Sequence, residues 1–164
     1  MRIRKLKTED LEDVLVIYEG ARSFMRSIGN MNQWNNGWPP REVLEEDIRL
    51  GQGYVCEEDG EILAVFAYWY GKDCEPSYRT IYEGSWKNDE PYGVIHRIAA
   101  RSGHKAGRFC MKWAMKESDG HLRMDTHLDN VAMRHVFETM GFERRGVIYL
   151  DNGHPREAYE YCRE

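Results

Sequence analysis

The spacing of hydrophobic positions changes several times along the chain, and each change marks the end of a predicted element. Short apolar or alternating runs predict strands at 3–7, 53–58, 61–70, 92–100, 121–127, 145–150 and 156–162. Apolar residues spaced three or four apart predict helices over 8–21, 41–52, a segment around 109–114, and 130–140. The predicted element order is therefore β-α-α-β-β-β-α-β-α-β-β.

Residues at the segment boundaries support this division. Asp59-Gly60 separates two apolar runs and predicts a tight hairpin. Thr8 is predicted to cap the first helix, and Gly141 to end the last one in a left-handed conformation. The order favours an α/β (α+β) class in which a mixed, mostly antiparallel central sheet is flanked by helices.

Length and composition fit one folded domain spanning residues 1–164. The chain is 41% hydrophobic and 12% aromatic, which excludes a disordered protein, and it has no internal repeat or low-complexity linker. Its net charge of −5 argues against broad affinity for nucleic acid or anionic membranes. No apolar run is long enough to span a membrane, and the charged N-terminus does not resemble a signal peptide.

The four cysteines are widely separated and include no C-x-x-C pair, which favours reduced thiols. The expected location is therefore the cytoplasm.

The stretch "HRIAARSGHKAGRFCMKWAM" joins a predicted strand to a predicted helix through small residues. Unpaired N–H groups at a helix start bind phosphate when the backbone can approach closely. Gly103, Ala106 and Gly107 allow that approach, while Lys105 and Arg108 add positive charge. An ordinary turn is the alternative. The spacing matches neither the nucleotide-triphosphatase loop nor the dinucleotide-binding glycine pattern.

Three side chains are candidates for acid–base chemistry. Asp125 and His127 alternate on one predicted strand and should face the same side, and His96 lies on the neighbouring strand. In the structural alternative Asp125 pairs with Arg97 or Arg123, and the histidines serve only packing. A His-Asp-His metal site is a third alternative, but the spacing does not show that the ligands converge, so no metal is predicted.

The element order, the strand-loop-helix at 92–117 and the segment "DTHLDNVAMRHVFETMGFERRGVIYL" together resemble the GNAT superfamily of N-acetyltransferases. The resemblance covers nearly the whole chain and implies the GNAT fold with acetyl-CoA as cosubstrate. In that family the loop Gln/Arg-x-x-Gly-x-Gly/Ala binds the pyrophosphate of the cofactor. Here Gly107 keeps the pattern, whereas Ser102 and Lys105 depart from it.

The resemblance also implies which residues would bind the cofactor. They are Ile98, Ala99, Ala100, Gly103, His104, Lys105, Ala106, Gly107, Arg108, Asn130, Met133 and Phe137. Asn130 is equally suited to be a helix N-cap, and Phe137 also fits a core position. Many family members carry a tyrosine acid seven residues after the asparagine, where this chain has Phe137. Tyr149 is a candidate substitute, although packing is the alternative for any single tyrosine.

The acceptor pocket of the family is built from the loop after the first helix and the insertion before the cofactor strand. Trp34, Trp38, Tyr82 and Trp86 lie in these segments and suit an amine on an apolar or cationic body.

The predicted function is acetyl transfer from acetyl-CoA to a primary amine of a small molecule, amino acid or peptide, within a ternary complex. The alternative is a catalytically weak CoA-binding sensor on the same fold, which Phe137 favours. No nucleic-acid or membrane partner is expected, and a homodimer is compatible with the sequence.

Overall fold

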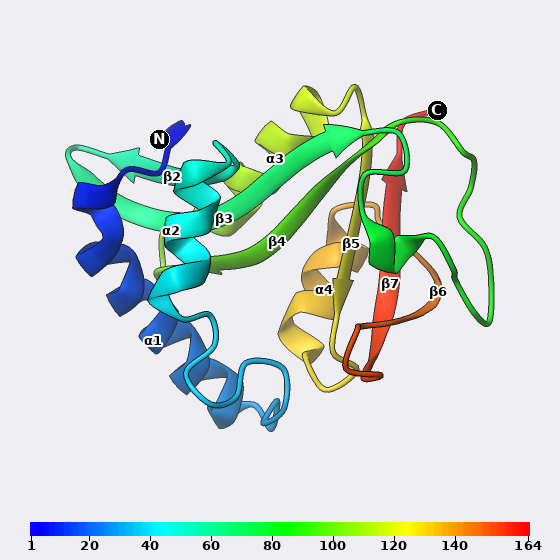
Figure 1. Ribbon diagram of the computed structural model, residues 1–164, viewed down its shortest axis with the longest axis horizontal. Coiled ribbons are helices and arrows are strands. Elements are labelled where there is room, and N and C mark those ends of the chain that lie inside the picture. The colour runs from blue at the N-terminus through cyan, green and yellow to red at the C-terminus, as the bar shows by residue number, and fades with distance from the viewer.

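The computed structural model describes residues 1–164 and contains a seven-stranded sheet with helices against it (Figure 1). The strands lie in the spatial order β1-β2-β3-β4-β5-β7-β6. Every neighbouring pair is antiparallel except β4 and β5, which are parallel. The predicted element order and the mixed, mostly antiparallel sheet are both confirmed.

The strands are β1 (Arg2–Lys5), β2 (Gly53–Glu58), β3 (Glu61–Gly71), β4 (Tyr92–Ala100), β5 (His121–Thr126), β6 (Glu143–Tyr149) and β7 (Pro155–Cys162). The helices are α1 (Leu11–Ser27), α2 (Arg41–Arg49), α3 (Ala106–Glu117) and α4 (Val131–Thr139), with short 3-10 turns η1 (Thr8–Asp10) and η2 (Pro76–Tyr78).

Two separate apolar clusters hold the helices against the sheet. One joins α1 and α2 to β2 and β3 and includes Leu11, Tyr18 and Leu44. The other joins α3 and α4 to the sheet and includes Met111 and Phe137. The amphipathic pattern of each helix thus matches the face that it buries. No helix combines the length and the apolar composition that crossing a bilayer would require.

Two of the three predicted boundary signals are confirmed by backbone geometry, whereas the first helix, predicted over 8–21, runs from Leu11 to Ser27. Asp59 and Gly60 have φ values of 52° and 81°, as a tight hairpin requires, and Gly141 ends α4 with φ 85°. The predicted Thr8 cap is wrong, because Thr8 lies in η1 and α1 begins only at Leu11. Asp10 holds this junction instead: its carboxylate accepts the N–H of Lys7 at 2.9 Å.

A bulge in β4 is the main irregularity of the sheet. Val65 of β3 pairs with Ala99, but Ala67 pairs with His96, so two steps along β3 face three along β4. Arg97 occupies this extra position with a φ of 54°. Bulges bend the strand that contains them, so the second half of β4 is directed away from its earlier course.

Beyond the bulge the parallel strands β4 and β5 separate. Their pairing is limited to Gly93 with Leu122 and Val94 with Arg123. Figure 1 shows the two halves of the sheet meeting at the upper end of these strands and diverging toward the lower end. A parallel pair that opens in this way exposes backbone and side chains of both strands to a space between them. The candidate site occupies that space.

Candidate functional site

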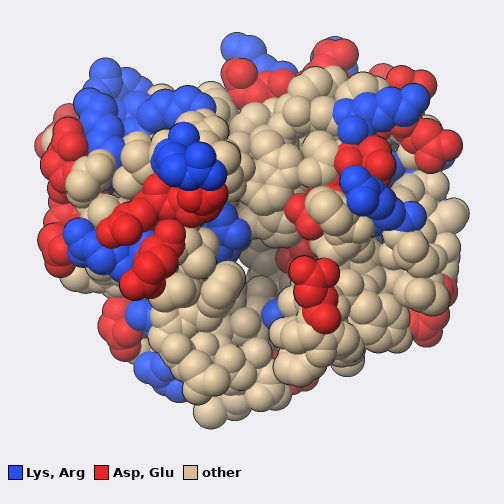
Figure 2. Space-filling model, in the orientation of Figure 1, with Lys and Arg blue, Asp and Glu red and all other residues tan.

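A pocket of about 200 Å³ lies where β4 and β5 diverge. β4 contributes the segment 95–98 to its wall, β5 contributes 124–126, and β7 contributes Arg156. Trp34 and Trp38 close it from the loop between α1 and α2. The space-filling view shows a hollow between the two halves of the molecule, with charges of both signs around it (Figure 2). Two of the four predicted acceptor residues therefore line the pocket.

His96 and Asp125 are brought together in this pocket. His96 Nδ1 lies 3.9 Å from Asp125 Oδ2, while His96 Nε2 lies 3.1 Å from Glu75 Oε2. The Tyr78 hydroxyl donates to Asp125 Oδ2 at 2.6 Å. Glu75 and Tyr78 come from the segment between β3 and β4, so this insertion forms part of the cluster.

The protonation of the cluster follows from its hydrogen bonds. Burial opposes ionisation of Glu75, but hydrogen bonds from His96 and Ser77 hold the pKa of its carboxyl below the ordinary value. An ionised carboxylate only accepts, so Nε2 of His96 carries the proton, and in the neutral ring Nδ1 keeps its lone pair. Burial, with the charge of Asp125, raises the pKa of Tyr78 well above its ordinary value, which keeps this hydroxyl a donor.

Neither of the structural pairings considered for Asp125 occurs. Arg97 donates to Asp47 at 2.6 and 2.8 Å, and Arg123 pairs with Glu160 at 3.0 Å. The positive group nearest to Asp125 is Arg156, whose Nε lies 3.9 Å from Oδ1.

His127 does not join the cluster, contrary to the prediction from strand alternation. β5 ends at Thr126, and the chain turns before His127 can continue the alternation. His127 Nδ1 instead accepts the N–H of Asp129 at 3.0 Å. Burial, together with the charge of Arg156, lowers the pKa of this imidazole. No three His, Cys, Asp or Glu side chains are grouped to hold a metal ion.

Tyr149 and Tyr82 also lie away from the pocket, which corrects both predictions. Tyr149 ends β6, the edge strand, and is 48% exposed. Its ring packs edge-on against Tyr82 with centroids 5.2 Å apart, and Tyr82 is held to the same strand by a bridge to Val147. The sequence placed both residues in plausible segments, but only the sheet order shows that β7 separates them from β5.

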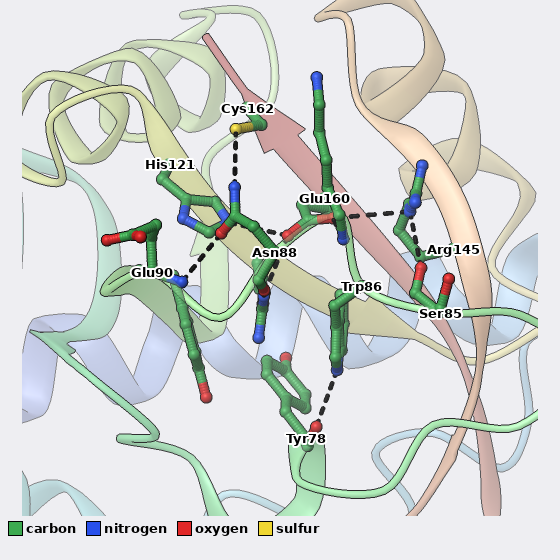
Figure 3. Close-up of polar contacts among 12 residues, drawn as sticks. Tyr78, Ser85, Trp86, Asn88, Glu90, His121, Arg145, Glu160 and Cys162 are labelled. Carbon is green, nitrogen blue, oxygen red and sulfur yellow. Dashed lines mark hydrogen bonds and ion pairs between the residues drawn. The ribbon is translucent and has the colours of Figure 1, made fainter.

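Trp86 is the fourth predicted acceptor residue, and it is structural. Its indole N–H donates to the carbonyl of Tyr78 at 2.7 Å, and its ring lies 4.4 Å from the guanidinium of Arg123 (Figure 3). It therefore packs beneath a buried ionic cluster around Glu160 and does not line the pocket.

A groove of about 710 Å³ continues from the pocket along the second half of β4. Ile98, Ala99 and Ala100 form its floor, and α1 and α4 form its walls. Ile98, Asn130 and Met133 line both the groove and the pocket, so the two spaces meet there. The groove reaches Ser102 and His104 at the far end.

The loop at that end carries free backbone donors. The N–H groups from Ser102 through Arg108 have no acceptor within the chain. Gly103 has φ 84° and Lys105 has φ 57°, which turns the chain into the start of α3. A Cβ on Gly107 would meet only Ala100 Cβ, at 3.8 Å, so its surface stays open. Small residues and unpaired donors at a helix start fit a diphosphate.

Two of the residues implied to bind the cofactor contribute differently from the expectation. Ala106 points its methyl group into the core, so only its backbone faces the loop. Phe137 is fully buried and stacks on Tyr159 with centroids 4.5 Å apart, so it cannot reach the groove. Val136, the preceding residue on α4, lines the groove in its place.

Asn130 caps α4, since its side chain accepts the N–H of Met133 at 3.1 Å. Its amide Nδ2 donates to Gln33 Oε1, also at 3.1 Å, which links α4 to the loop between α1 and α2. The N-cap interpretation is confirmed.

Sequence reasoning missed several residues of the site. On α1, Val16, Gly20 and Phe24 line the groove, and their spacing of four outside the core stripe was a usable signal. Arg156 occupies a buried position of β7, where a charged residue is unexpected. Nothing local in the sequence indicates the part played by Gln33.

Comparison with known proteins agrees with this fold. The model of the acetyltransferase (GNAT) family matches residues 16–142. The crystal structure of a GNAT-family acetyltransferase from Streptococcus agalactiae 2603 superposes with a TM-score of 0.87 at 30% identity, covering 99% of this chain and 95% of that one. The chain therefore belongs to the GNAT family of acetyltransferases and is an acyltransferase.

More distant structures share the fold alone. An N-acetyltransferase from Staphylococcus aureus Mu50 has a TM-score of 0.63 at 13% identity, covering 98% of this chain and all 100% of that one. The ribosomal-protein-alanine N-acetyltransferase from Brucella melitensis has a TM-score of 0.61 at 19% identity, covering 99% of this chain and 100% of that one. No curated protein matches the sequence.

Proposed function

We propose that the protein transfers the acetyl group of acetyl-CoA to a primary amine held in the pocket between β4 and β5, with both substrates bound together. The observation that carries this proposal is the meeting of groove and pocket at Ile98, Asn130 and Met133. A cofactor arm in the groove would end beside an amine in the pocket. Placing two reactants in contact supplies much of the acceleration in such reactions.

The loop from Ser102 to Arg108 would hold the diphosphate of acetyl-CoA, through the free N–H groups and the charges of Lys105 and Arg108. Ile98, Ala99 and Ala100 would line the pantetheine arm. Bound acetyl-CoA supplies an activated acetyl thioester. Residues 1–164 would act as one catalytic domain, because groove and pocket together use elements from α1 to β7.

His96 would act as the base. Its Nδ1 would take a proton from the amine, directly or through one water, while Glu75 holds Nε2–H and so fixes the ring. The amine nitrogen forms a bond to the acetyl carbon as the carbon–sulfur bond breaks. The departing thiolate takes a proton from water. Because a thiol has a pKa of about 8.5, this step needs little acid assistance, which accommodates Phe137 at the usual tyrosine position.

The direct test measures thiol released from acetyl-CoA when a panel of primary amines is supplied. We expect coenzyme A to stabilise the fold by about 2.7 kcal/mol at a hundredfold excess over its dissociation constant, and at least one amine to release thiol. Stabilisation without thiol release from any amine would contradict the proposal and support the sensor.

Gly107→Val tests the loop. A side chain there blocks close approach of the phosphates, so coenzyme A should bind about tenfold more weakly or worse, while the fold persists. Lys112→Val, at an exposed site on the same helix, is the control and should leave the affinity unchanged. Equal affinity in both variants would reject the loop as the diphosphate site.

A further inference from the structure

Arg156 is a buried cation that the chain leaves without adequate partners. Its side chain is 8% exposed and lines the pocket. Its Nε lies 3.9 Å from Asp125 Oδ1, which is too far for a hydrogen bond, and its Nη1 reaches the carbonyl of Pro155 only at 3.5 Å. A guanidinium has five N–H donors, so most of them face no acceptor in the chain.

Two other arginines, the buried Arg123 and the half-buried Arg97, have closer partners. Arg123 donates to Glu160 Oε1 at 3.0 Å and to the carbonyl of Asn88 at 2.7 Å. Arg97, which also lines the pocket, is held by both carboxylate oxygens of Asp47. Of the two arginines that line the pocket, only Arg156 makes no hydrogen bond to a carboxylate.

Leaving a buried charge unpaired is costly, and burial lowers the pKa of Arg156 from its ordinary value. A guanidinium nevertheless remains charged in proteins. An anion supplied from outside would satisfy both its charge and its free donors. The planar fork of a guanidinium matches a carboxylate, which it binds through two parallel hydrogen bonds.

The distance between this cation and the base limits the ligand further. Asp125 separates them: Arg156 Nε is 3.9 Å from its Oδ1, and His96 Nδ1 is 3.9 Å from its Oδ2. His96 and Arg156 thus flank one carboxylate, so a single small molecule can present an amine to His96 and a carboxylate to Arg156. A cavity of about 150 Å³ holds a benzene, so the pocket of about 200 Å³ admits a small molecule and not a folded protein segment.

We propose that the acceptor is a free α-amino acid, with its carboxylate on Arg156, its amine at His96 and its side chain against Trp34 and Trp38. The ligand is a zwitterion, and the site offers it a cation for the carboxylate and carboxylates near the amine. The product would be the N-acetylamino acid. This inference rests on the proposed acetyl transfer and specifies its substrate.

The test compares matched acceptors in the thiol-release assay. Each of a panel of L-amino acids is paired with its carboxamide and with the amine lacking the carboxyl group. We expect kcat/KM for the preferred acid to exceed that of both analogues by roughly tenfold to a hundredfold, the range of a charge-assisted contact. Analogues that react as well as the acids would overturn the carboxylate subsite and leave the acetyl transfer standing. If coenzyme A binds and no acceptor of any kind reacts, the proposed function itself fails.

The variant Arg156→Gln tests whether Arg156 binds the carboxylate of the acceptor or only supports the fold. We expect the acid-to-carboxamide ratio to fall to about one, because the rate with the acid drops toward that of the carboxamide. General damage would lower both rates equally and keep the ratio, which would overturn the role of Arg156. Arg144→Gln, at a surface arginine on β6, should keep the wild-type ratio. If Arg156→Gln does not fold, the wild-type ratio decides.

Discussion

Two buried ion pairs lie on the same face of the neighbouring strands β5 and β7, with opposite consequences. Arg123 of β5 sits opposite Glu160 of β7, whereas Asp125, two residues further along β5, sits opposite Ala158 and approaches Arg156 diagonally. The first pair is 3.0 Å apart and the second 3.9 Å. The sign of the charges is reversed between the strands, but the strands, the face and the type of pair are the same.

The Glu160 pair is closed on every side. His121 Nε2 lies 2.7 Å from Glu160 Oε1, and the N–H of Lys87 donates to Oε2 at 2.9 Å. Arg145 approaches from β6 at 3.5 Å, and the insertion 72–91 covers the cluster (Figure 3). β4 still pairs with β5 at this level. Each charge is therefore matched within the chain, as in a structural cluster.

The Asp125 pair lies past the point where β4 and β5 separate. Its groups face the pocket, and Arg156 keeps free donors. The two pairs therefore combine the same kinds of charge and differ in whether the fold covers them. A covered pair should govern stability, and under the proposed function the open pair should govern catalysis.

The largest effect is expected at His96. His96→Gln keeps a donor for Glu75 but removes the base, so kcat should fall about 10²- to 10⁴-fold while coenzyme A still binds. Single-turnover thiol release and thermal shifts with coenzyme A measure the two quantities. An unchanged kcat would mean that His96 and its neighbours in the pocket serve the structure and not the reaction.

Mutation of the covered cluster around Glu160 should lower the stability of the fold. Glu160→Ala leaves Arg123 as an uncompensated buried cation and removes the carboxylate beside His121 Nε2, so the free energy of unfolding should fall by about 3–5 kcal/mol. Urea denaturation measures it. Glu143→Ala, which removes an exposed partner of the same Arg145, should have no measurable effect. A loss below about 1 kcal/mol for Glu160→Ala would contradict the assignment.

Acid should weaken the same cluster. Burial opposes ionisation of Glu160, yet hydrogen bonds from His121, Lys87 and Arg123 hold the pKa of its carboxyl below the ordinary value. Its stabilising contribution is therefore present above the unfolded-state pKa of about 4.3 and is lost as the pH falls through the lower folded-state value. Below about pH 4, Glu160→Ala should lose stability less steeply than the wild type, by up to about 1.4 kcal/mol per pH unit. Parallel slopes would contradict this.

The smallest effect on stability is expected at Arg156. Arg156→Met removes a buried charge that makes no hydrogen bond to a carboxylate, and Asp125 keeps the hydrogen bond from Tyr78, so the free energy of unfolding should change by less than about 1 kcal/mol or rise. Arg123→Met, by contrast, breaks a satisfied pair and should lower it by about 3–5 kcal/mol. Equal losses in the two variants would remove the distinction between the clusters.

The fold was largely predictable because its signals are local. Periodicity fixed the order of strands and helices, and Asp59-Gly60, Asn130 and Gly141 marked ends through their own backbone chemistry. The Thr8 prediction failed because the carboxylate of Asp10, five residues after the end of β1, accepts the N–H of Lys7 and pairs with Arg4.

The site was only partly predictable. His96 and Asp125 lie close together, as predicted, because the two strands that carry them are neighbours in the sheet. Their catalytic role stays a prediction. Tyr82 and Trp86 were misplaced because nothing in a loop's sequence says which strand it will cover, and Tyr149 because its strand, β6, lies at the sheet edge beyond β7.

The elements, their order, the small-residue loop before α3 and the family to which the chain belongs could all be read from the amino-acid sequence. The point where β4 parts from β5, the insertion residues that reach His96 and Asp125, and the buried arginine that lacks a hydrogen-bonded carboxylate became visible only in the folded molecule. Those outcomes depend on contacts between residues far apart in the chain. A charge has the same local sequence signal whether its partner comes from the protein or from a substrate.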